Sequence, residues 1–272
     1  MGISKYIGAA ISAALIAFSM GTAAQAKEWK TVRIGTEGAY PPFNELKPDG
    51  TLVGFDIDIA KALCDQMKVK CVFVTQDWDG MIPALLAGKF DAIIASMSIT
   101  PEREKKVAFT NKYYNTPPAI AVPKDSDLKV ATKGKNLDLA ALDKALSGKM
   151  LGAQSATTHA NYAQAHLPDA QLKLYPTADE YKLDLGSGRL DAAIDDIVVL
   201  SQWLNSPEGT CCKLLGTVPV DTKINGVGVG IALRKGDTDL KKMFNDAIVA
   251  IRKNGVYKKV NDKYFDFDVY GD

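Results

Sequence analysis

Two similar segments, residues 88–94 (GKFDAII) and residues 188–194 (GRLDAAI), constrain the fold of this chain more than any other feature. The same order of apolar and amphipathic segments surrounds both copies. Strands are expected at residues 31–36, 70–75 and 91–95, and again at residues 149–153, 171–175 and 191–195. Helices are expected between them, at residues 56–67, 80–87, 157–165 and 178–185. The order βαβαβ predicts a mostly parallel sheet covered by helices, so we expect two related α/β lobes.

The segments outside these two units predict how the lobes are joined. Residues 115–118 (NTPP) form a stiff extended connection. After the second unit come residues 218–225, an apolar strand at 226–233 and a long helix with one apolar face. This last segment has no third lobe to join, so it is expected to return to the first. We therefore expect lobe 1 to comprise residues 27–116 and 221–272, lobe 2 to comprise residues 117–220, and the two crossings to act as a hinge.

The first 26 residues have the pattern of a secretory signal peptide. Lys5 precedes an uncharged apolar run at residues 7–20, and Ala24-Gln25-Ala26 is a cleavage signature. A membrane anchor is the alternative, but the run is short for a bilayer span. We expect cleavage after Ala26 and a soluble periplasmic protein. Of the 33 basic and 32 acidic residues, cleavage removes only Lys5, so the mature chain lacks the basic excess of a nucleic-acid binder.

The chain has four cysteines, which allow three pairings. Export favours disulfide formation. A Cys64–Cys71 bond would join the end of one expected helix to the start of the next strand. Cys211 and Cys212 are adjacent, and a bond between neighbours is strained, so they are free or pair elsewhere. A zinc site is disfavoured because the C-x2-C pairs of such sites are missing.

Motifs of common enzymes are missing from the sequence. Gly226-x-Gly-x-Gly230 lies within an expected strand instead of a strand-to-helix turn, which disfavours a dinucleotide site. There is no phosphate-binding P-loop, no G-x-S-x-G and no H-E-x-x-H. The sequence therefore calls for no cofactor and favours a binding protein over an enzyme.

Ligands of open α/β sheets bind beyond the carboxyl ends of the strands. The polar and aromatic residues expected there are Glu37, Tyr40, Trp78, Asp79, Ser96, Ser98, Arg103, Thr157, Thr158, Asp195 and Asp196. Arg103 can hold a carboxylate through two parallel hydrogen bonds, and Asp196 can hold an ammonium group. Trp78 and Tyr40 can enclose an aliphatic or guanidinium stem, and Glu37 can face a second positive charge. The set predicts a free α-amino acid with a cationic side chain.

These residues also have purely structural interpretations. Ser96 and Ser98 can be turn residues, Trp78 can belong to the core, and Glu37 can be a solvated surface residue. Thr100-Pro101 can begin a helix, which would make Arg103 a surface residue of its first turn. Asp196 can cap the helix that follows it. We interpret Asp195 as a capping or surface residue.

Several stretches resemble the family 3 periplasmic solute-binding proteins of polar amino-acid ABC transporters, especially the lysine/arginine/ornithine and histidine binders. They are residues 35–43 (GTEGAYPPF), 54–58 (GFDID), 91–100 (DAIIASMSIT), Arg103, the pair Cys64 and Cys71, and residues 263–272 (KYFDFDVYGD). The resemblance implies a two-lobed α/β binding protein with two hinge-crossing strands that works as a monomer and delivers its ligand to a membrane permease.

The resemblance also implies roles for individual residues. Arg103, Ser98, Thr157 and the main chain near Ser96 would bind the ligand carboxylate, and Asp196 would bind the α-ammonium. Tyr40 and Trp78 would flank the side chain, and Glu37 would face its cation. Three positions depart from the basic amino-acid binders, which usually have aspartate, serine and glutamine where this chain has Glu37, Ala95 and Thr158.

Three alternatives share this fold. Glu37 and the Trp78-Asp79-Gly80 stretch also resemble opine binders, although retained Ser98 and Asp196 favour a free amino acid. Periplasmic cyclohexadienyl dehydratases resemble the family too and would make the acids and the arginine catalytic. A signalling module would present the ligand to a chemoreceptor.

Overall fold

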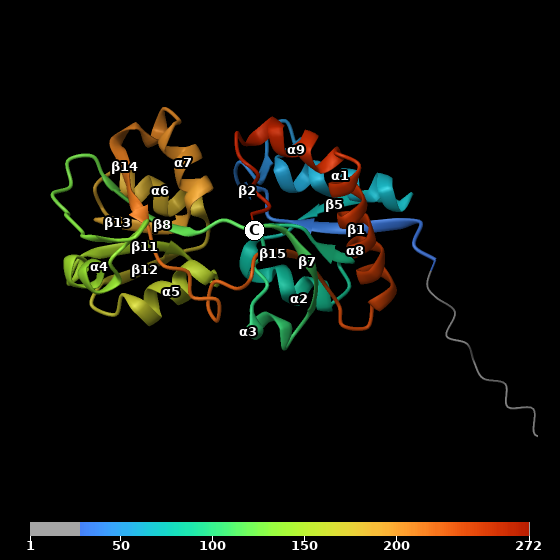
Figure 1. Ribbon diagram of the computed structural model, residues 1–272, viewed down its shortest axis with the longest axis horizontal. Coiled ribbons are helices and arrows are strands. Elements are labelled where there is room, and N and C mark those ends of the chain that lie inside the picture. Colours follow the sequence, from blue (N-terminus) through green and yellow to red (C-terminus); the bar gives the residue numbers. More distant parts are fainter. Residues whose placement is uncertain (1–27, 272) are drawn as a thin grey trace, which may run out of the picture.

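Two five-stranded sheets form two lobes that lie side by side (Figure 1). The computed structural model describes residues 28–271, and the expected signal peptide lies outside the described residues. The strand orders are β5-β1-β6-β15-β7 in the first sheet and β12-β11-β13-β8-β14 in the second. The predicted two-lobed α/β architecture is thus confirmed.

The elements of the first lobe come from both ends of the described chain. They are β1 (Thr31–Thr36), β2 (Ala39–Tyr40), β3 (Asn44–Leu46), β4 (Leu52–Val53), α1 (Phe55–Met67), β5 (Lys70–Thr75), η1 (Trp78–Gly80), α2 (Met81–Leu86), β6 (Ala92–Ile93), α3 (Pro101–Glu104), β7 (Ala108–Tyr114), β15 (Val229–Leu233), α8 (Thr238–Lys253) and α9 (Val256–Tyr264). Helix α8 packs against α1 and β7, so the C-terminal segment lies on the first lobe.

The elements of the second lobe are continuous in sequence. They are β8 (Pro118–Pro123), β9 (Thr132–Lys133), β10 (Asn136–Leu137), α4 (Leu139–Leu146), β11 (Met150–Gln154), α5 (Thr158–His166), β12 (Gln171–Tyr175), α6 (Ala178–Gly186), β13 (Ala192–Asp196), α7 (Ile197–Leu204), η2 (Glu208–Cys211) and β14 (Cys212–Thr217).

The repeated segments occupy equivalent places in the two lobes. Gly88 and Gly188 follow α2 and α6 with φ of +76° and +73°, a conformation that favours glycine. Asp91 and Asp191 precede β6 and β13, and their carboxylates accept hydrogen bonds of 3.0 and 2.7 Å from main-chain N–H groups of β1 and β11. In each lobe the repeated segment therefore supplies the glycine that follows a helix and the aspartate whose carboxylate binds the first strand of the sheet.

The chain crosses between the lobes twice, after Tyr114 and after Thr217. Strands β1, β5 and β6 are parallel, as are β11, β12 and β13, whereas β15 and β8 run antiparallel beside β6 and β13. The Val218 N–H donates to the Pro118 carbonyl at 3.0 Å, so the two crossing segments lie side by side. The strand expected at residues 226–233 begins only at Val229, because Gly226 and Gly228 have positive φ.

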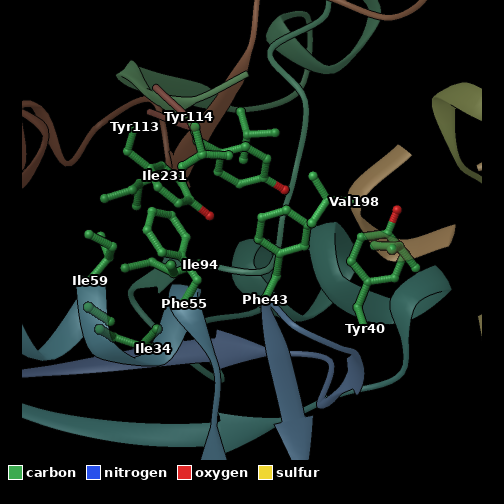
Figure 2. Packing of buried hydrophobic residues seen from close by; sticks show 14 of the residues in the cluster. Ile34, Tyr40, Phe43, Phe55, Ile59, Ile94, Tyr113, Tyr114, Val198 and Ile231 are labelled. Carbon is green, nitrogen blue, oxygen red and sulfur yellow. The ribbon is translucent and has the colours of Figure 1, made fainter. Parts of the chain in front are cut away.

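Buried aromatic rings connect the first lobe to the crossing region (Figure 2). The rings of Phe43 and Tyr114 stack with centroids 4.5 Å apart. Val198 of α7 belongs to the same buried cluster, so the apolar core continues from one lobe to the other.

The Cys64–Cys71 disulfide joins α1 to β5, with Cα atoms 6.0 Å apart, which confirms that pairing. Cys211 and Cys212 are free. Within residues 28–271, no helix is long and apolar enough to cross a membrane, and no group of acidic, histidine or cysteine side chains could hold a metal ion.

Candidate ligand-binding site

A cavity lies where the carboxyl ends of the strands of the two lobes face each other. Its lining residues are Glu37, Tyr40, Trp78, Ala95, Ser96, Ser98, Arg103, Gln154, Thr157, Thr158 and His159. The set includes these candidates from the sequence: Glu37, Tyr40, Trp78, Ala95, Ser96, Ser98, Arg103, Thr157 and Thr158. The candidate Asp196 is not in it, and Gln154 and His159 are additions that the sequence analysis did not name.

Arg103 contributes a guanidinium group that contacts carbonyl groups and an aromatic ring. The Thr100 side chain caps α3 and accepts from the Arg103 N–H at 3.2 Å. The guanidinium donates to the Ser98 carbonyl at 3.0 Å and to the Ala156 carbonyl at 3.3 Å, and lies 5.3 Å from the ring centre of Trp78. Burial lowers the pKa of Arg103 to about 10. Within residues 28–271 it forms no ion pair with a carboxylate, so its charge is available to an anionic ligand group.

Glu37 contributes the opposite charge to the same cavity. It follows β1, and its carboxylate accepts a 2.6 Å hydrogen bond from the Gln154 amide of β11. Burial raises the pKa of Glu37 to about 7, and the negative charges of Asp195 and Asp179 act in the same direction. A cation bound beside Glu37 would stabilise the ionised carboxylate and so lower its pKa, against both effects.

Asp195 is fully engaged inside the molecule, so its interpretation as a capping or surface residue was wrong. Only 2% of its surface is exposed. Its carboxylate accepts hydrogen bonds of 2.5 Å from Tyr40 and from Tyr181, and the Nδ1 atom of His159 lies 3.1 Å away. Burial lowers the pKa of His159, and the nearby Asp195 carboxylate acts in the opposite direction. Strand β13 ends at Asp196, and Asp196 is the N-cap of α7. Asp195 therefore does not cap this helix.

Asp196 is the N-cap of α7 and is not among the lining residues of the cavity. Its carboxylate accepts from the Val198 N–H at 2.7 Å and from the Thr116 hydroxyl. Burial raises the pKa of Asp196 to about 7, with a further contribution from Asp195. In this structure Asp196 therefore acts as a helix cap.

A buried carboxylate outside the cavity holds two of its walls together. Asp56 of α1 is fully buried and accepts hydrogen bonds from Ser96 at 3.0 Å, Asn44 at 2.9 Å and Tyr113 at 2.7 Å. Ser96 has φ of +56°, which is unfavourable for a residue with a side chain. Asn44 in turn accepts from the Gly38 N–H at 2.8 Å, next to Glu37. Asp56 thus ties the Ser96 loop to the loop that carries Glu37 and Tyr40.

Direct contacts close the two lobes around the cavity. Trp78 donates to the Ala156 carbonyl at 3.2 Å, and Ser155 donates to Asp79 at 3.1 Å. The Tyr40–Asp195 and Glu37–Gln154 hydrogen bonds also cross between the lobes.

The two cavity residues that sequence reasoning missed have different origins. Gln154 is the last residue of β11, the same kind of strand end that indicated the other candidates. His159 lies on α5, one residue after Thr158, and faces the cavity from the first turn of that helix. The strand-end rule could have found Gln154, whereas His159 required the orientation of the helix.

The sequence profile of the bacterial extracellular solute-binding proteins, family 3, matches residues 32–267. The chain belongs to this family. It is 47% identical to an L-arginine-binding protein of Pseudomonas aeruginosa over 89% of this chain and 90% of the relative. It is 40% identical to the lysine/arginine/ornithine-binding periplasmic protein of Escherichia coli over 95% of this chain and 96% of the relative.

The fold of this family 3 protein also matches solved structures. The structure of an ancestral arginine-binding protein bound to arginine superposes with a TM-score of 0.77 at 35% identity, covering 87% of this chain and 98% of that chain.

Proposed function

We propose that this protein captures a cationic L-amino acid, of the arginine, lysine and ornithine class, and delivers it to the permease of an ABC transporter. One observation carries the proposal. Arg103, which has no carboxylate partner among residues 28–271, and Glu37, whose carboxyl has a raised pKa, line the same cavity. An amino acid with a cationic side chain supplies a carboxylate for the first and a cation for the second.

Each cavity wall has a role in this proposal. Arg103, Ser98, Thr157, Thr158 and the main chain at Ala95 and Ser96 bind the ligand carboxylate. Tyr40 and Trp78 enclose the side chain, and Glu37, held by Gln154, receives the cation. Asp196 receives the α-ammonium, which compensates the desolvation that raises the pKa of its carboxyl. For this contact the Thr116 hydroxyl must release an Asp196 oxygen or share it with the ligand.

Ligand capture depends on closure of the two lobes. We propose that residues 27–116 and 221–272 move as one body and residues 117–220 as the other, about the crossings at 115–118 and 218–225. Neither lobe alone supplies partners for all the charges of the ligand, so the ligand favours the closed state. The mature chain, cleaved after Ala26, would act as a monomer in the periplasm, without a cofactor or nucleic acid.

A thermal-shift screen followed by calorimetry tests this function. The compounds are the twenty amino acids together with ornithine, citrulline and octopine. A cationic amino acid at 100 times its Kd should stabilise the protein by about 2.7 kcal/mol. Octopine as the best ligand would assign the protein to opine uptake. Product formation from prephenate or arogenate would instead make it a dehydratase.

A further inference from the structure

The adjacent residues Cys211 and Cys212 form a close thiol pair away from the ligand cavity. Cys211 ends η2, Cys212 begins β14, and their Sγ atoms are 2.9 Å apart. A disulfide bond is about 2.0 Å long, so the two sulfur atoms need to approach by only about 1 Å to form one.

The two thiols differ in how a reagent can reach them. Cys212 is 3% exposed and belongs to the apolar core, and burial together with the neighbouring Cys211 thiol raises the pKa of its own thiol to about 12. Cys211 is partly exposed and lines a surface groove together with Trp203 of α7 and Lys47 of the first lobe. An oxidant in this groove therefore meets Cys211 first.

We propose that Cys211 and Cys212 are a redox modification site that forms a reversible disulfide between neighbouring residues. The oxidant is a disulfide, either glutathione disulfide or the disulfide of a thiol oxidoreductase. The Cys211 thiolate attacks one oxidant sulfur, forms a mixed disulfide and releases the first oxidant thiolate. The Cys212 thiolate then attacks the Cys211 sulfur and releases the second. Two electrons pass to the oxidant, and the two protons lost by the cysteines convert it to two thiols.

This bond should be easier to reduce than the Cys64–Cys71 disulfide. The Cα atoms of neighbouring residues are about 3.8 Å apart, below the usual range of 4.4–6.8 Å for a disulfide, which strains the bond. The Cα atoms of Cys64 and Cys71 are 6.0 Å apart, within that range. One chain thus carries a structural disulfide and a second, more reducible pair.

Thiol labelling of the mature protein at a series of glutathione redox potentials tests the proposal. After each equilibration the protein is unfolded, alkylated with iodoacetamide and analysed by peptide mass spectrometry. We expect Cys211 and Cys212 to lose reactivity together as the buffer becomes more oxidising, with loss of the mass of two hydrogen atoms. This transition should occur at a higher potential than that of Cys64 and Cys71.

Other labelling outcomes would overturn the proposal. They are alkylation of both residues at every potential, a stable glutathione adduct on Cys211 of the wild-type protein, or cross-linked chains. Cys212→Ser is the matched variant, and it should accumulate the glutathione adduct on Cys211 because no second thiol displaces it. Arginine binding should be equal in the oxidised and reduced proteins, since neither cysteine lines the ligand cavity, so a failure of the proposed function would be seen separately.

Discussion

The hydroxyl of Tyr40 donates a 2.5 Å hydrogen bond to Asp195 across the boundary between the two lobes. Tyr181 donates an equally short hydrogen bond to the other oxygen of the same carboxylate, but from within the second lobe. The two tyrosines therefore have the same chemistry and differ in whether their bond must break when the lobes separate.

Tyr40→Phe should weaken arginine binding, because it removes a contact that exists only when the lobes are closed. A hydrogen bond to a charged group contributes about 1.5–3 kcal/mol, which corresponds to roughly a 10- to 100-fold loss of affinity. Calorimetry at pH 7 measures this change.

Tyr181→Phe is the control for that experiment. It should lower the thermal stability of the protein and change its arginine affinity little. Equal losses of affinity in the two variants would contradict a role of the Tyr40–Asp195 bond in closure.

The preference for arginine over citrulline should depend on pH through Glu37. Burial raises the pKa of Glu37 to about 7 when no cation faces it, as beside the neutral side chain of citrulline. The arginine guanidinium instead keeps Glu37 ionised. As the pH falls below 7, the citrulline complex gains a stabilising proton and the arginine complex does not. The ratio of the two affinities should therefore fall by about tenfold per pH unit below 7 and stay constant above it.

Calorimetry with both ligands between about pH 5 and pH 8 measures this ratio. Asp196 faces the α-ammonium of both ligands in the proposed binding mode, so its effect cancels in the comparison. The variant Glu37→Gln should make the ratio independent of pH. A pH-independent ratio in the wild-type protein would show that Glu37 does not face the side-chain cation.

Arg103→Ala should reduce affinity for every amino acid tested, because the ligand carboxylate loses its charged partner in a closed cavity. The expected cost is roughly 2–5 kcal/mol. Arg103→Lys keeps the charge but lacks the two parallel donors, so it should recover only part of the affinity. Near-native binding by the alanine variant would show that Arg103 does not bind the ligand carboxylate and has only a structural role.

Asp56→Asn should weaken arginine binding although Asp56 does not line the cavity. The variant disturbs the three hydrogen bonds that hold Ser96, Asn44 and Tyr113. Asp58→Asn is the control on the same helix, since Asp58 bonds to Lys263 and Tyr264 away from the cavity. If the folded variants bind arginine equally well, Asp56 contributes only to stability.

The amino-acid sequence by itself determined the two-lobed architecture, the Cys64–Cys71 bond and most of the cavity wall. These features depend on short-range patterns. The repeat around Gly88 and Gly188 specifies the end of a helix and the next buried strand, and strand ends of a parallel sheet meet at one edge.

Only the tertiary structure decided the roles of Asp195 and Asp196. The side chains of neighbouring strand residues point in opposite directions. Asp195 therefore binds Tyr40 while Asp196 caps α7. If β13 ended one residue earlier or later, these two roles would fall on different residues. Local sequence patterns locate a strand end less accurately than that. His159 and the Glu37–Gln154 bond likewise depend on how α5 is turned and how the lobes close, since their partners come from distant parts of the chain.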